Sequence, residues 1–536
     1  MPVARTHSIA LVGVEGHPVE IESDIENGLP GLLLVGLPDT ALREARDRIR
    51  AAIVNSGEQW PQRRITVGLS PASLPKRGSG FDLGIAVSVL AAAGTVPVAA
   101  IEGVTFLGEL GLDGRLRPVC GVLPAVAGAA AAGFRKVAVP EASAPEAALV
   151  PGLAVLGSPT LGALLAWLRG ERETGQEVTV RMSGNGAGVQ TGQPASPAGV
   201  GPSRTAGPPS PSGQVSSRPD LADVLGQPAA RRAAEICAAG GHHLSLLGPP
   251  GVGKTMLAER IPTIMPGLDR PAALEVTAIH SVAGTLPPGS PLIAQPPYCA
   301  PHHTATKAAI VGGGSGIIRP GAASLAHRGC LFLDEAPEFG RDVLDALRQP
   351  LESGEVVVAR LGLTARFPAR FTLVLAANPC PCAKGPGSAM GCTCSSTERR
   401  RYQARLSGPL LDRVDVKVEF LPVSRAELLS DRGFAEPSSV VVKRVEAARG
   451  RAAARLRHTP WRLNAGIPGS ELRRSFAPGP GALAPLERAM DLGEISARGV
   501  DRVIRVAWTL ADLAGVTRPT VEETSYALGL WLGVGR

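Results

Sequence analysis

A glycine-rich turn between an apolar run and a helical run contains residue types that could bind phosphate. The turn follows the apolar residues 244–247, precedes the helical run MLAERI, and consists of Gly248, Pro249, Pro250, Gly251, Val252, Gly253, Lys254 and Thr255. Glycines let backbone N–H groups approach phosphate oxygens, and a helix N-terminus favours anions. In this pattern Lys254 reaches the outer phosphates and Thr255 can ligate Mg²⁺. The turn therefore predicts a site for ATP with Mg²⁺.

Polar side chains follow two other apolar runs. Asp334 and Glu335 come after CLFL (330–333), and Asn378 comes after TLVLAA (372–377). A carboxylate at the carboxyl end of a strand beside a phosphate loop can hold Mg²⁺, and the next carboxylate can polarise the attacking water. Asn378 could orient that water and sense the γ-phosphate. Alone, the acidic pair would be a solvated surface pair, but after a phosphate loop it predicts a hydrolysis site.

Four of the eight cysteines lie directly after Asn378, and they form two C-x-C pairs: Cys380, Cys382, Cys392 and Cys394. Four thiolates suit tetrahedral zinc, and Gly385, Pro386 and Gly387 permit the chain to fold back between the pairs. The C-x-C spacing is tighter than the more typical C-x₂-C. We predict a structural Zn²⁺ here, with a redox pair and free surface thiols as the alternatives.

The distribution of residue types divides the 536-residue chain into separate parts. From Gly170 to Pro219 large apolar residues almost vanish, so this stretch cannot bury enough surface to offset its chain entropy. We predict a domain at 1–168, a disordered Gly/Pro/Ser-rich linker at 169–218, an ATPase core at 219–422 and a helical lid at 423–536. The chain is long enough for several cores of ordinary size.

The first of these parts has a mixed order of expected strands and helices. Strands are predicted at 31–37 and 63–71, helices at 40–57, 81–94 and 125–134, a hairpin turning at Asp113-Gly114, and a closing strand at 136–140. The part from 219 to about 422 alternates strands and helices. Helical periodicity then covers 440–457 and the chain from Ala482 onward. An α+β domain, an α/β core and an all-α lid are therefore predicted.

The distribution of charged residues and of apolar runs indicates which partners the protein binds and in which cellular compartment it lies. Residues 219–536 hold 37 Lys and Arg against 29 Asp and Glu, whereas residues 1–170 hold 14 against 15. The excess indicates a polyanion partner, with a solvated Arg-rich surface as the alternative. No basic-then-apolar signal opens the chain, and the apolar stretch 84–101 is broken by Gly94 and Pro97. We predict a soluble cytoplasmic protein without a membrane partner, in which clustered cysteines stay reduced.

Two inserts between the strands of the ATPase core could contact DNA. The segment IVGGGSGIIRPG (310–321) has the glycine punctuation of a hairpin or mobile loop. The segment ESGEVVVARLGLTARFPARF (352–371) is typical of two strands around Leu361-Gly362, and Arg360 near its tip could grip a phosphate. A surface hairpin with an incidental arginine is the alternative. Contacts of this kind would read the backbone, so DNA binding should depend weakly on base sequence.

The phosphate loop together with LFLDE and LAANP resembles the core of an AAA+ ATPase. Longer stretches are similar to the magnesium-chelatase-like branch, of the ComM/YifB family: APHHTATKAAIVGGGSGIIRPGAASLAHRGCLFLDEAPEF, NPCPC, RLSGPLLDRVDVKVE and SARGVDRVIRVAWTLADLAG. The resemblance covers nearly the whole chain apart from the linker. It implies a hexameric ring that hydrolyses ATP and drives branch migration as a helicase on single-stranded or branched DNA. The alternative is a chelatase-like accessory ATPase that remodels a protein or metal-insertion partner.

The resemblance also implies roles for two arginines. Arg413 in LLDRVD matches the arginine finger that reaches the ATP of the neighbouring subunit, and Arg498 in SAR matches the sensor arginine of the helical lid. Both imply active sites formed between subunits. From the residues alone, these are two of many surface arginines.

Two stretches of the first domain, LPKRGSGFDLGIAVSVLAAAG and LGELGLDGRLRPVCGVLPAVAGAAAAGFRKVAVPEA, resemble the proteolytic domain of Lon. That family places a nucleophilic serine where this chain has Asp82, and a lysine base where it has Leu123. A leucine cannot accept a proton, and a carboxylate poorly replaces an activated hydroxyl. We therefore predict this fold without proteolysis, with a role in protein contact or substrate guidance, and an active protease is disfavoured.

Overall fold

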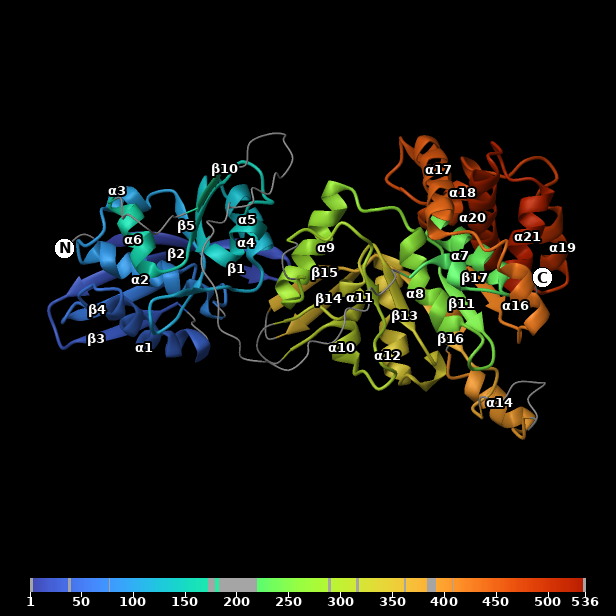
Figure 1. Ribbon diagram of the computed structural model, residues 1–536, viewed down its shortest axis with the longest axis horizontal. Helices are drawn as coiled ribbons and strands as arrows, with labels where there is room; N and C mark the ends of the chain where they lie inside the picture. Colours follow the sequence, from blue (N-terminus) through green and yellow to red (C-terminus); the bar gives the residue numbers. More distant parts are fainter. Residues whose placement is uncertain are drawn as a thin grey trace, which may run out of the picture.

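The computed structural model describes residues 3–36, 40–76, 78–171, 179–182, 219–287, 291–314, 318–360, 363–382, 392–406 and 408–533. Three parts follow one another along an elongated molecule, with the two chain ends far apart (Figure 1). We call them the N-terminal part (3–182), the central part (219–420) and the helical part (425–533). In the described residues, no helix combines the length and apolar character needed to cross a bilayer.

The N-terminal part contains an eight-stranded sheet in the order β10-β9-β8-β5-β1-β2-β4-β3. Pairing is antiparallel for β1–β2, β2–β4 and β9–β10 and parallel for the rest. The strands are β1 (Ala4–Val12), β2 (Glu15–Glu26), β3 (Gly31–Val35), β4 (Arg64–Ser70), β5 (Val104–Phe106), β8 (Lys136–Pro140), β9 (Ala154–Ser158) and β10 (Thr179–Met182). A small separate hairpin pairs β6 (Glu109–Leu110) with β7 (Leu116–Arg117).

Helices cover both faces of this sheet. The helices are α1 (Thr40–Asn55), α2 (Asp82–Ala92), α3 (Val98–Ile101), α4 (Val122–Ala131), α5 (Ala144–Ala147) and α6 (Leu161–Leu168). Successive residues of a strand point to opposite faces, so Ala10 belongs to the core that includes α1, α2 and α6, whereas Ile9 belongs to the core that includes α4 and α5. The sheet is therefore the middle layer between two hydrophobic cores.

The central part contains a five-stranded, all-parallel sheet in the order β12-β13-β16-β11-β17. Its strands are β11 (Leu244–Leu247), β12 (Tyr298–Cys299), β13 (Cys330–Leu333), β16 (Thr372–Ala377) and β17 (Val416–Glu419). Strands β13 and β16 are buried along their whole length, as expected for a parallel sheet covered on both faces.

Helices of the central part surround the sheet, and a hairpin extends from it. The helices are α7 (Pro228–Gly240), α8 (Lys254–Ile264), α9 (Arg270–Ala283), α10 (Lys307–Val311), α11 (Ala322–Leu325), α12 (Arg341–Ala346), α13 (Arg348–Ser353), α14 (Ser396–Gln403) and α15 (Gly408–Leu411). The hairpin pairs β14 (Glu355–Arg360) with β15 (Leu363–Pro368) and lies on the side of the N-terminal part (Figure 1).

The helical part shares a hydrophobic core with α7, α8, β11 and β17 of the central part. Its helices are α16 (Arg425–Asp431), α17 (Ser438–Leu456), α18 (Gly469–Arg474), α19 (Ala484–Asp491), α20 (Ala497–Ala514) and α21 (Val521–Leu532). Buried polar groups also join the two parts, because the Asp415 carboxylate at the start of β17 accepts from Arg502 of α20 at 2.8 Å. The predicted all-α end of the chain is confirmed.

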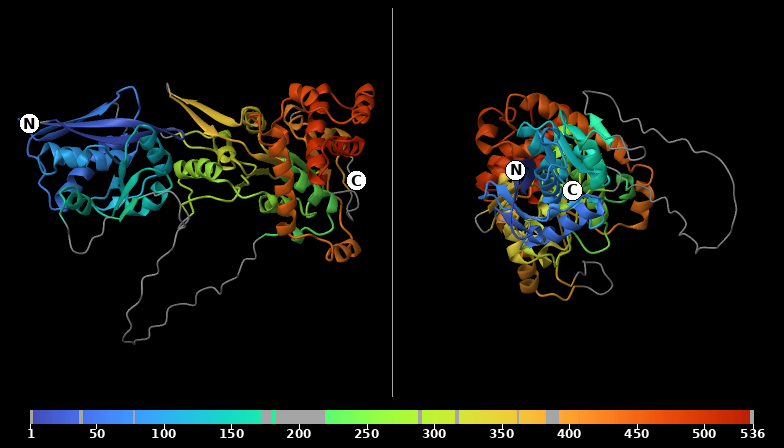
Figure 2. Two further views of the ribbon diagram at one scale, coloured as in Figure 1. Left: turned by 90° about the horizontal axis from the view of Figure 1, so that it is seen from above. Right: turned by 90° about the vertical axis from the view of Figure 1, so that its left-hand side faces the viewer.

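The N-terminal part contacts the central part through the turn between β1 and β2. Leu11, Val12 and Val14 pack against Phe367 of β15 and Val282 of α9. A second contact lies nearby, where the Gly121 N–H donates to the Ser281 carbonyl at 3.0 Å. Figure 2 shows this junction as the narrow connection between the two parts. The N-terminal part therefore rests directly on the base of the β14–β15 hairpin.

Several expected elements agree with the structure, two do not, and one hairpin was not expected. The hairpin around Leu361-Gly362 forms on both sides of that dipeptide, which itself lies outside the described residues. Strand β8 does not close its domain, because β9 and α6 follow it. The β1–β2 hairpin, at residues 4–26, was not expected at all. The expectation of a disordered linker is wrong for 179–182, which pair with β9, and the remainder of 172–218 lies outside the described residues.

Candidate nucleotide site and cysteine cluster

The central sheet brings the predicted nucleotide-site residues to one edge. The phosphate loop leaves β11, Asp334 and Glu335 leave β13, and Asn378 leaves β16, which lies between the other two strands. Parallel strands end at the same edge, so these side chains converge. The loop is anchored there, because the Gly248 N–H donates to the Ala377 carbonyl at 3.1 Å.

Lys254 lies at the centre of this edge. It is 7% exposed, and its Nζ donates to the Gly248 carbonyl at 2.6 Å, to the Pro249 carbonyl at 2.8 Å and to Asn378 Oδ1 at 3.1 Å. Burial lowers the pKa of the Lys254 ammonium, while Asp334 and Glu335 act in the opposite direction. The ammonium is thus held at the loop by carbonyl groups that a phosphate could replace as partners.

The loop takes backbone conformations that glycine adopts without strain. Gly251 has φ +80° and Gly253 has φ +97°, in the left-handed region. Gly253 directly precedes α8, so the backbone N–H groups at the start of this 11-residue helix follow the turn. The predicted phosphate cradle is therefore present as a strand, a glycine turn and a helix N-terminus.

Thr255 and Asp334, the two residues predicted to hold magnesium, contact each other directly. The Thr255 hydroxyl donates to Asp334 Oδ2 at 2.7 Å, and Asp334 Oδ1 accepts from the Glu335 N–H at 2.9 Å. A hydroxyl and a carboxylate are oxygen ligands that Mg²⁺ prefers. The residues fit the ion that the sequence predicts for this place.

Glu335 has a strained backbone and a half-exposed side chain. Its φ is +49°, one of two positive values among the described non-glycine residues, and 51% of its side chain is exposed. Residues held in this region concentrate at functional sites, because surrounding structure must enforce the conformation. His303, from the loop before α10, places Nδ1 3.5 Å from Glu335 Oε2.

His303 is a site residue that sequence reasoning missed. It lies within the quoted stretch APHHTATKAAI, yet no spacing rule links it to Glu335, which is 32 residues further along. Its ring lies 4.1 Å, centroid to centroid, from that of His302. A pair of histidines before a helix in an ATPase sequence was the available signal.

The described contacts of Arg413, one of the two predicted intersubunit arginines, are with residues outside the phosphate loop. Arg413 is hydrogen-bonded to the Pro409 carbonyl and paired with Glu352 of α13. Burial first, and then the charges of Arg348, Arg502 and Arg498, lower the pKa of Arg413. Among the described contacts, none joins Arg413 or Arg498 to Lys254, Asp334 or Asn378. Their predicted roles stay predictions.

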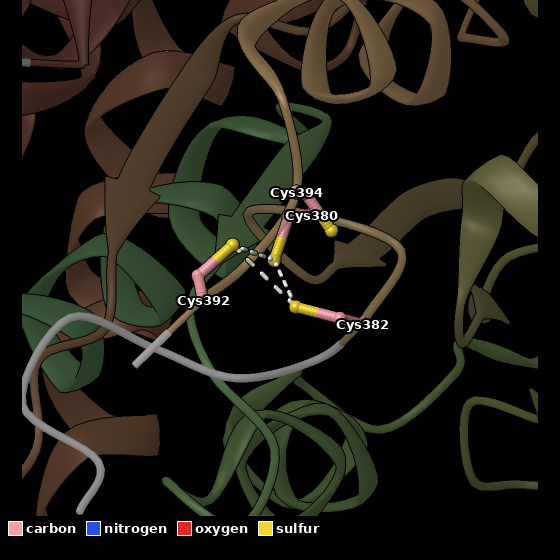
Figure 3. Close-up of side chains that lie close together, drawn as sticks. All are labelled: Cys380, Cys382, Cys392 and Cys394. Atoms are coloured by element: carbon pink, nitrogen blue, oxygen red, sulfur yellow. Dashed lines mark hydrogen bonds between the residues drawn. The ribbon is translucent and has the colours of Figure 1, made fainter. Parts of the chain in front are cut away.

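The side chains of the four clustered cysteines converge, although they come from two separate C-x-C pairs. One Sγ from each of Cys380, Cys382, Cys392 and Cys394 lies within 4.8 Å of all the others. None of the four forms a disulfide (Figure 3). This arrangement is compatible with a metal site and agrees with the predicted ligand set.

The predicted DNA contacts are placed only in part. Arg360 ends β14 and pairs with Leu363 of β15, so it occupies the expected position near the hairpin tip, while its side chain lies outside the described residues. In the first insert, Gly313 and Arg319 form an antiparallel bridge. Residues 310–311 end helix α10 and residues 315–317 lie outside the described residues, so the expectation of a hairpin or mobile loop at 310–321 stays a prediction.

In the N-terminal part, Asp82 and Leu123 have structural partners. Both carboxylate oxygens of Asp82 accept from Arg48, at 2.6 and 3.1 Å, and the carboxylate is fully buried. Burial raises the pKa of Asp82 to about 6, against the opposing effect of Arg48. Leu123 is 3% exposed within the second core of that part.

A phosphate loop, an acidic pair and an asparagine at neighbouring ends of a parallel sheet define the P-loop ATPase class. Family comparisons agree: "Magnesium chelatase, subunit ChlI" matches residues 220–428, "Subunit ChlI of Mg-chelatase" matches 21–143, and "Magnesium chelatase, subunit ChlI C-terminal" matches 435–530. The chain belongs to the magnesium-chelatase-like AAA+ ATPases of the ComM/YifB family. This family implies ATPase activity.

Three curated proteins are similar to the chain over nearly its whole length. An uncharacterised protein of Mycobacterium tuberculosis is 50% identical over 98% of both chains. The uncharacterised protein YifB of Escherichia coli is 39% identical over 98% of this chain and 96% of its own. The competence protein ComM of Haemophilus influenzae is 38% identical over 99% of this chain and 97% of its own.

Proposed function

We propose that the protein is a cytoplasmic, ATP-hydrolysing ring motor that acts on single-stranded or branched DNA. The observation that carries the proposal is the convergence of Lys254, Thr255, Asp334 and Asn378 at one sheet edge, in a chain with a protruding hairpin. Similarity to a protein named for competence supports an action on DNA. The excess of basic residues in 219–536 agrees with a polyanion partner.

In the proposed reaction, Lys254 holds the outer phosphates of ATP in place of its loop carbonyls. Thr255 and Asp334 would hold Mg²⁺, which supplies charge neutralisation as the γ-phosphoryl group leaves. Glu335 orients and polarises the attacking water, and its exposed carboxylate has free lone pairs for that role. Asn378, which accepts a hydrogen bond from Lys254, would sense the γ-phosphate.

Arg413 and Arg498 complete the site of a neighbouring subunit in this proposal. The charge of Arg498 acts on Arg413, and no described contact joins either arginine to Lys254, Asp334 or Asn378, which agrees with a role at an interface between subunits. An arginine supplied by a neighbour makes hydrolysis depend on assembly. A hexamer is the assembly that the proposal assumes.

The β14–β15 hairpin, with Arg360 near its tip, is the proposed DNA contact. Its base packs against the β1–β2 turn, so a movement of the hairpin would also move the residues of the N-terminal part that contact it. We propose that the N-terminal part is a Lon-like domain without proteolytic activity that guides substrate. The ion pair of Asp82 with Arg48 supports this, because that carboxylate is already engaged.

A chelatase-like accessory ATPase is the second candidate, favoured by the three family models that match this chain. Such a protein would hydrolyse ATP in the same way. Its turnover would respond to a protein or metal-insertion partner and not to DNA.

ATP turnover of the full chain with forked, single-stranded and blunt duplex DNA separates the two candidates. The motor proposal predicts stimulation that is greatest with forked or single-stranded DNA, together with a sixfold mass in native measurements with ATP. Turnover unaffected by all three DNAs, at low and moderate salt, would contradict the motor and favour the accessory ATPase. Lys254→Ala serves as the background control, because it removes the phosphate contact.

A further inference from the structure

The cysteine cluster brings four sulfur atoms to one point beside the nucleotide edge. Sγ of Cys380 lies 3.1 Å from that of Cys382 and 3.4 Å from that of Cys392, and the Cys382–Cys392 distance is 3.5 Å. These separations exceed the ~2.05 Å of a disulfide, so the sulfurs are close without being bonded. Figure 3 shows the side chains of both pairs directed toward a common centre.

Four sulfurs at these separations match the ligand set of a tetrahedral metal. A zinc ion binds thiolate at about 2.3 Å, which puts ligating sulfurs roughly 3.8 Å apart. Every pair in the cluster lies within 4.8 Å, so small side-chain rotations would suffice. Among the described residues, the cluster consists of thiols alone, and an all-thiolate set favours zinc over magnesium or calcium.

We propose that Cys380, Cys382, Cys392 and Cys394 bind one Zn²⁺ as four thiolates, and that this ion fixes helix α14 to the catalytic edge of the central sheet. Zinc binding itself does not depend on the proposed DNA function. The consequence for hydrolysis does rest on the ATPase assignment of that edge. With four protein ligands the ion has no open position, so its role is structural.

The cluster joins two segments that the chain would otherwise connect loosely. Cys380 comes two residues after Asn378, and Cys394 comes directly before Ser395, the residue that caps α14. The cap is reciprocal, because the Glu398 N–H donates to Ser395 Oγ at 3.2 Å and Glu398 Oε2 accepts from the Ser395 N–H at 2.7 Å. A zinc ion would therefore fix the start of α14 close to the end of β16.

The far end of α14 returns to the catalytic edge. Tyr402 is 4% exposed and forms a hydrogen bond with the backbone of Asn378, and Gln403 Nε2 donates to the Pro379 carbonyl at 3.5 Å. Just beyond the helix, Arg405 Nη1 donates to Glu338 Oε2 at 2.9 Å, three residues after Glu335. Helix α14 therefore acts as a brace. Its N-terminal end follows the cysteine cluster, and its C-terminal end contacts the segments that carry Asn378 and Glu335.

Loss of the ion should release this brace and disturb the position of Asn378. A displacement of about 1 Å in a catalytic group can reduce turnover by roughly 10²-fold. Nucleotide binding should change less, because the main contacts of Lys254 are with the loop itself. We therefore expect zinc loss to lower kcat for ATP by about tenfold to a hundredfold with a smaller change in KM.

Metal analysis of the full chain, purified without chelator and under reducing conditions, tests the proposal without nucleotide or DNA. We expect about one equivalent of zinc per chain. Replacement with Co²⁺ should give the intense thiolate-to-metal absorption of a tetrathiolate site. Less than about a tenth of an equivalent of zinc, with four freely titratable thiols in the folded protein, would overturn the proposal.

The zinc content of cysteine variants then shows whether the ion binds at the cluster or at another cysteine. Cys392→Ser and Cys394→Ser should each lose zinc, whereas Cys120→Ser, at an exposed cysteine of the N-terminal part, should retain it. Full zinc content in both cluster variants would also contradict the site. If these variants do not fold, the cobalt spectrum of the native chain still decides. A zinc-containing protein that ignores DNA would refute the motor and leave the metal site standing.

Discussion

Asp82 in the N-terminal part and the Asp334–Glu335 pair in the central part are acidic groups at the ends of buried elements, and their surroundings differ. Asp82 begins α2, is fully buried, and gives both oxygens to Arg48. Glu335 follows β13 with half of its side chain exposed and a single histidine nearby. A carboxylate whose lone pairs are engaged stabilises structure, whereas one with free lone pairs can act on a ligand or water.

Two buried lysines repeat the same contrast. Lys76 is fully buried, donates to the Pro71 carbonyl, and has its pKa lowered by burial. Lys254 is also buried, yet it stands at a glycine turn beside Asp334 and Glu335, whose charges act against the lowering of its pKa by burial. The proposed role of Lys254 as a phosphate ligand therefore rests on the loop and the acidic groups around it, because burial alone does not distinguish it from Lys76.

The largest effect is expected at the interface between subunits. Arg413→Ala should preserve ATP binding and reduce hydrolysis by about 10³-fold or more, because a finger stabilises charge only in the transition state. Steady-state turnover together with nucleotide binding measures this. Arg341→Ala is the matched control, since Arg341 of α12 is 84% exposed.

Mixing the variants shows whether Arg413 acts across the interface. Arg413→Ala protein mixed with Glu335→Gln protein should regain part of the activity, because some interfaces then have both intact groups. No recovery, in assemblies shown to contain both proteins, would contradict a finger supplied by a neighbour.

A second prediction tests whether the Asp82 carboxylate stabilises structure and takes no part in catalysis. Asp82→Ser introduces the hydroxyl that the resemblance to Lon places here, but we expect no peptidase activity, because Leu123 supplies no base. The change leaves Arg48 without its partner, and removing one member of a buried pair costs about 3–5 kcal/mol of stability. Thermal unfolding of the full chain should show a lower midpoint for the N-terminal part.

Asp113→Ser is the control for that measurement, because Asp113 is 58% exposed and pairs with Arg115 only at the surface. Its unfolding midpoint should stay close to that of the native chain. Peptide cleavage by Asp82→Ser protein, or an unchanged midpoint, would break the comparison between the two acidic sites.

The smallest effect is expected at the hairpin. Arg360→Glu should weaken DNA binding and lower the slope of log affinity against log salt by about one, while basal ATP turnover stays near normal. Arg341→Glu is the matched control on the same part of the chain. Unchanged DNA affinity over a range of salt would remove Arg360 from the DNA path.

Sequence patterns identified the residues that converge at this sheet edge because local signals mark each of its segments. The glycine turn, Asp334–Glu335 and Asn378 each follow an apolar run, and parallel strands necessarily end together. His303 was missed because its position beside Glu335 depends on how the loop before α10 folds, which has no periodic signature. The Arg48–Asp82 pair was missed for the same reason, since it joins two helices 34 residues apart.

The limits of the N-terminal part were harder to infer than its individual elements. In the sequence, the predicted succession of strands and helices ends at residues 136–140. In the structure, β9 pairs with this strand and β10 pairs with β9. A short segment can become a strand because it pairs with the exposed edge of a sheet. The composition of 179–182 therefore did not predict its strand conformation. The turn of β1–β2 was likewise undetected, because its packing partners belong to the central part.

ATP turnover of Glu335→Gln beside Asp82→Asn tests most directly the claim that the chemistry of this chain resides at the central edge. Glu335→Gln should bind ATP normally and lose turnover by about 10²-fold to 10⁴-fold, because a general base is removed. Asp82→Asn should keep native turnover in the folded protein. Near-native turnover in Glu335→Gln, or a comparable loss in folded Asp82→Asn, would contradict the claim.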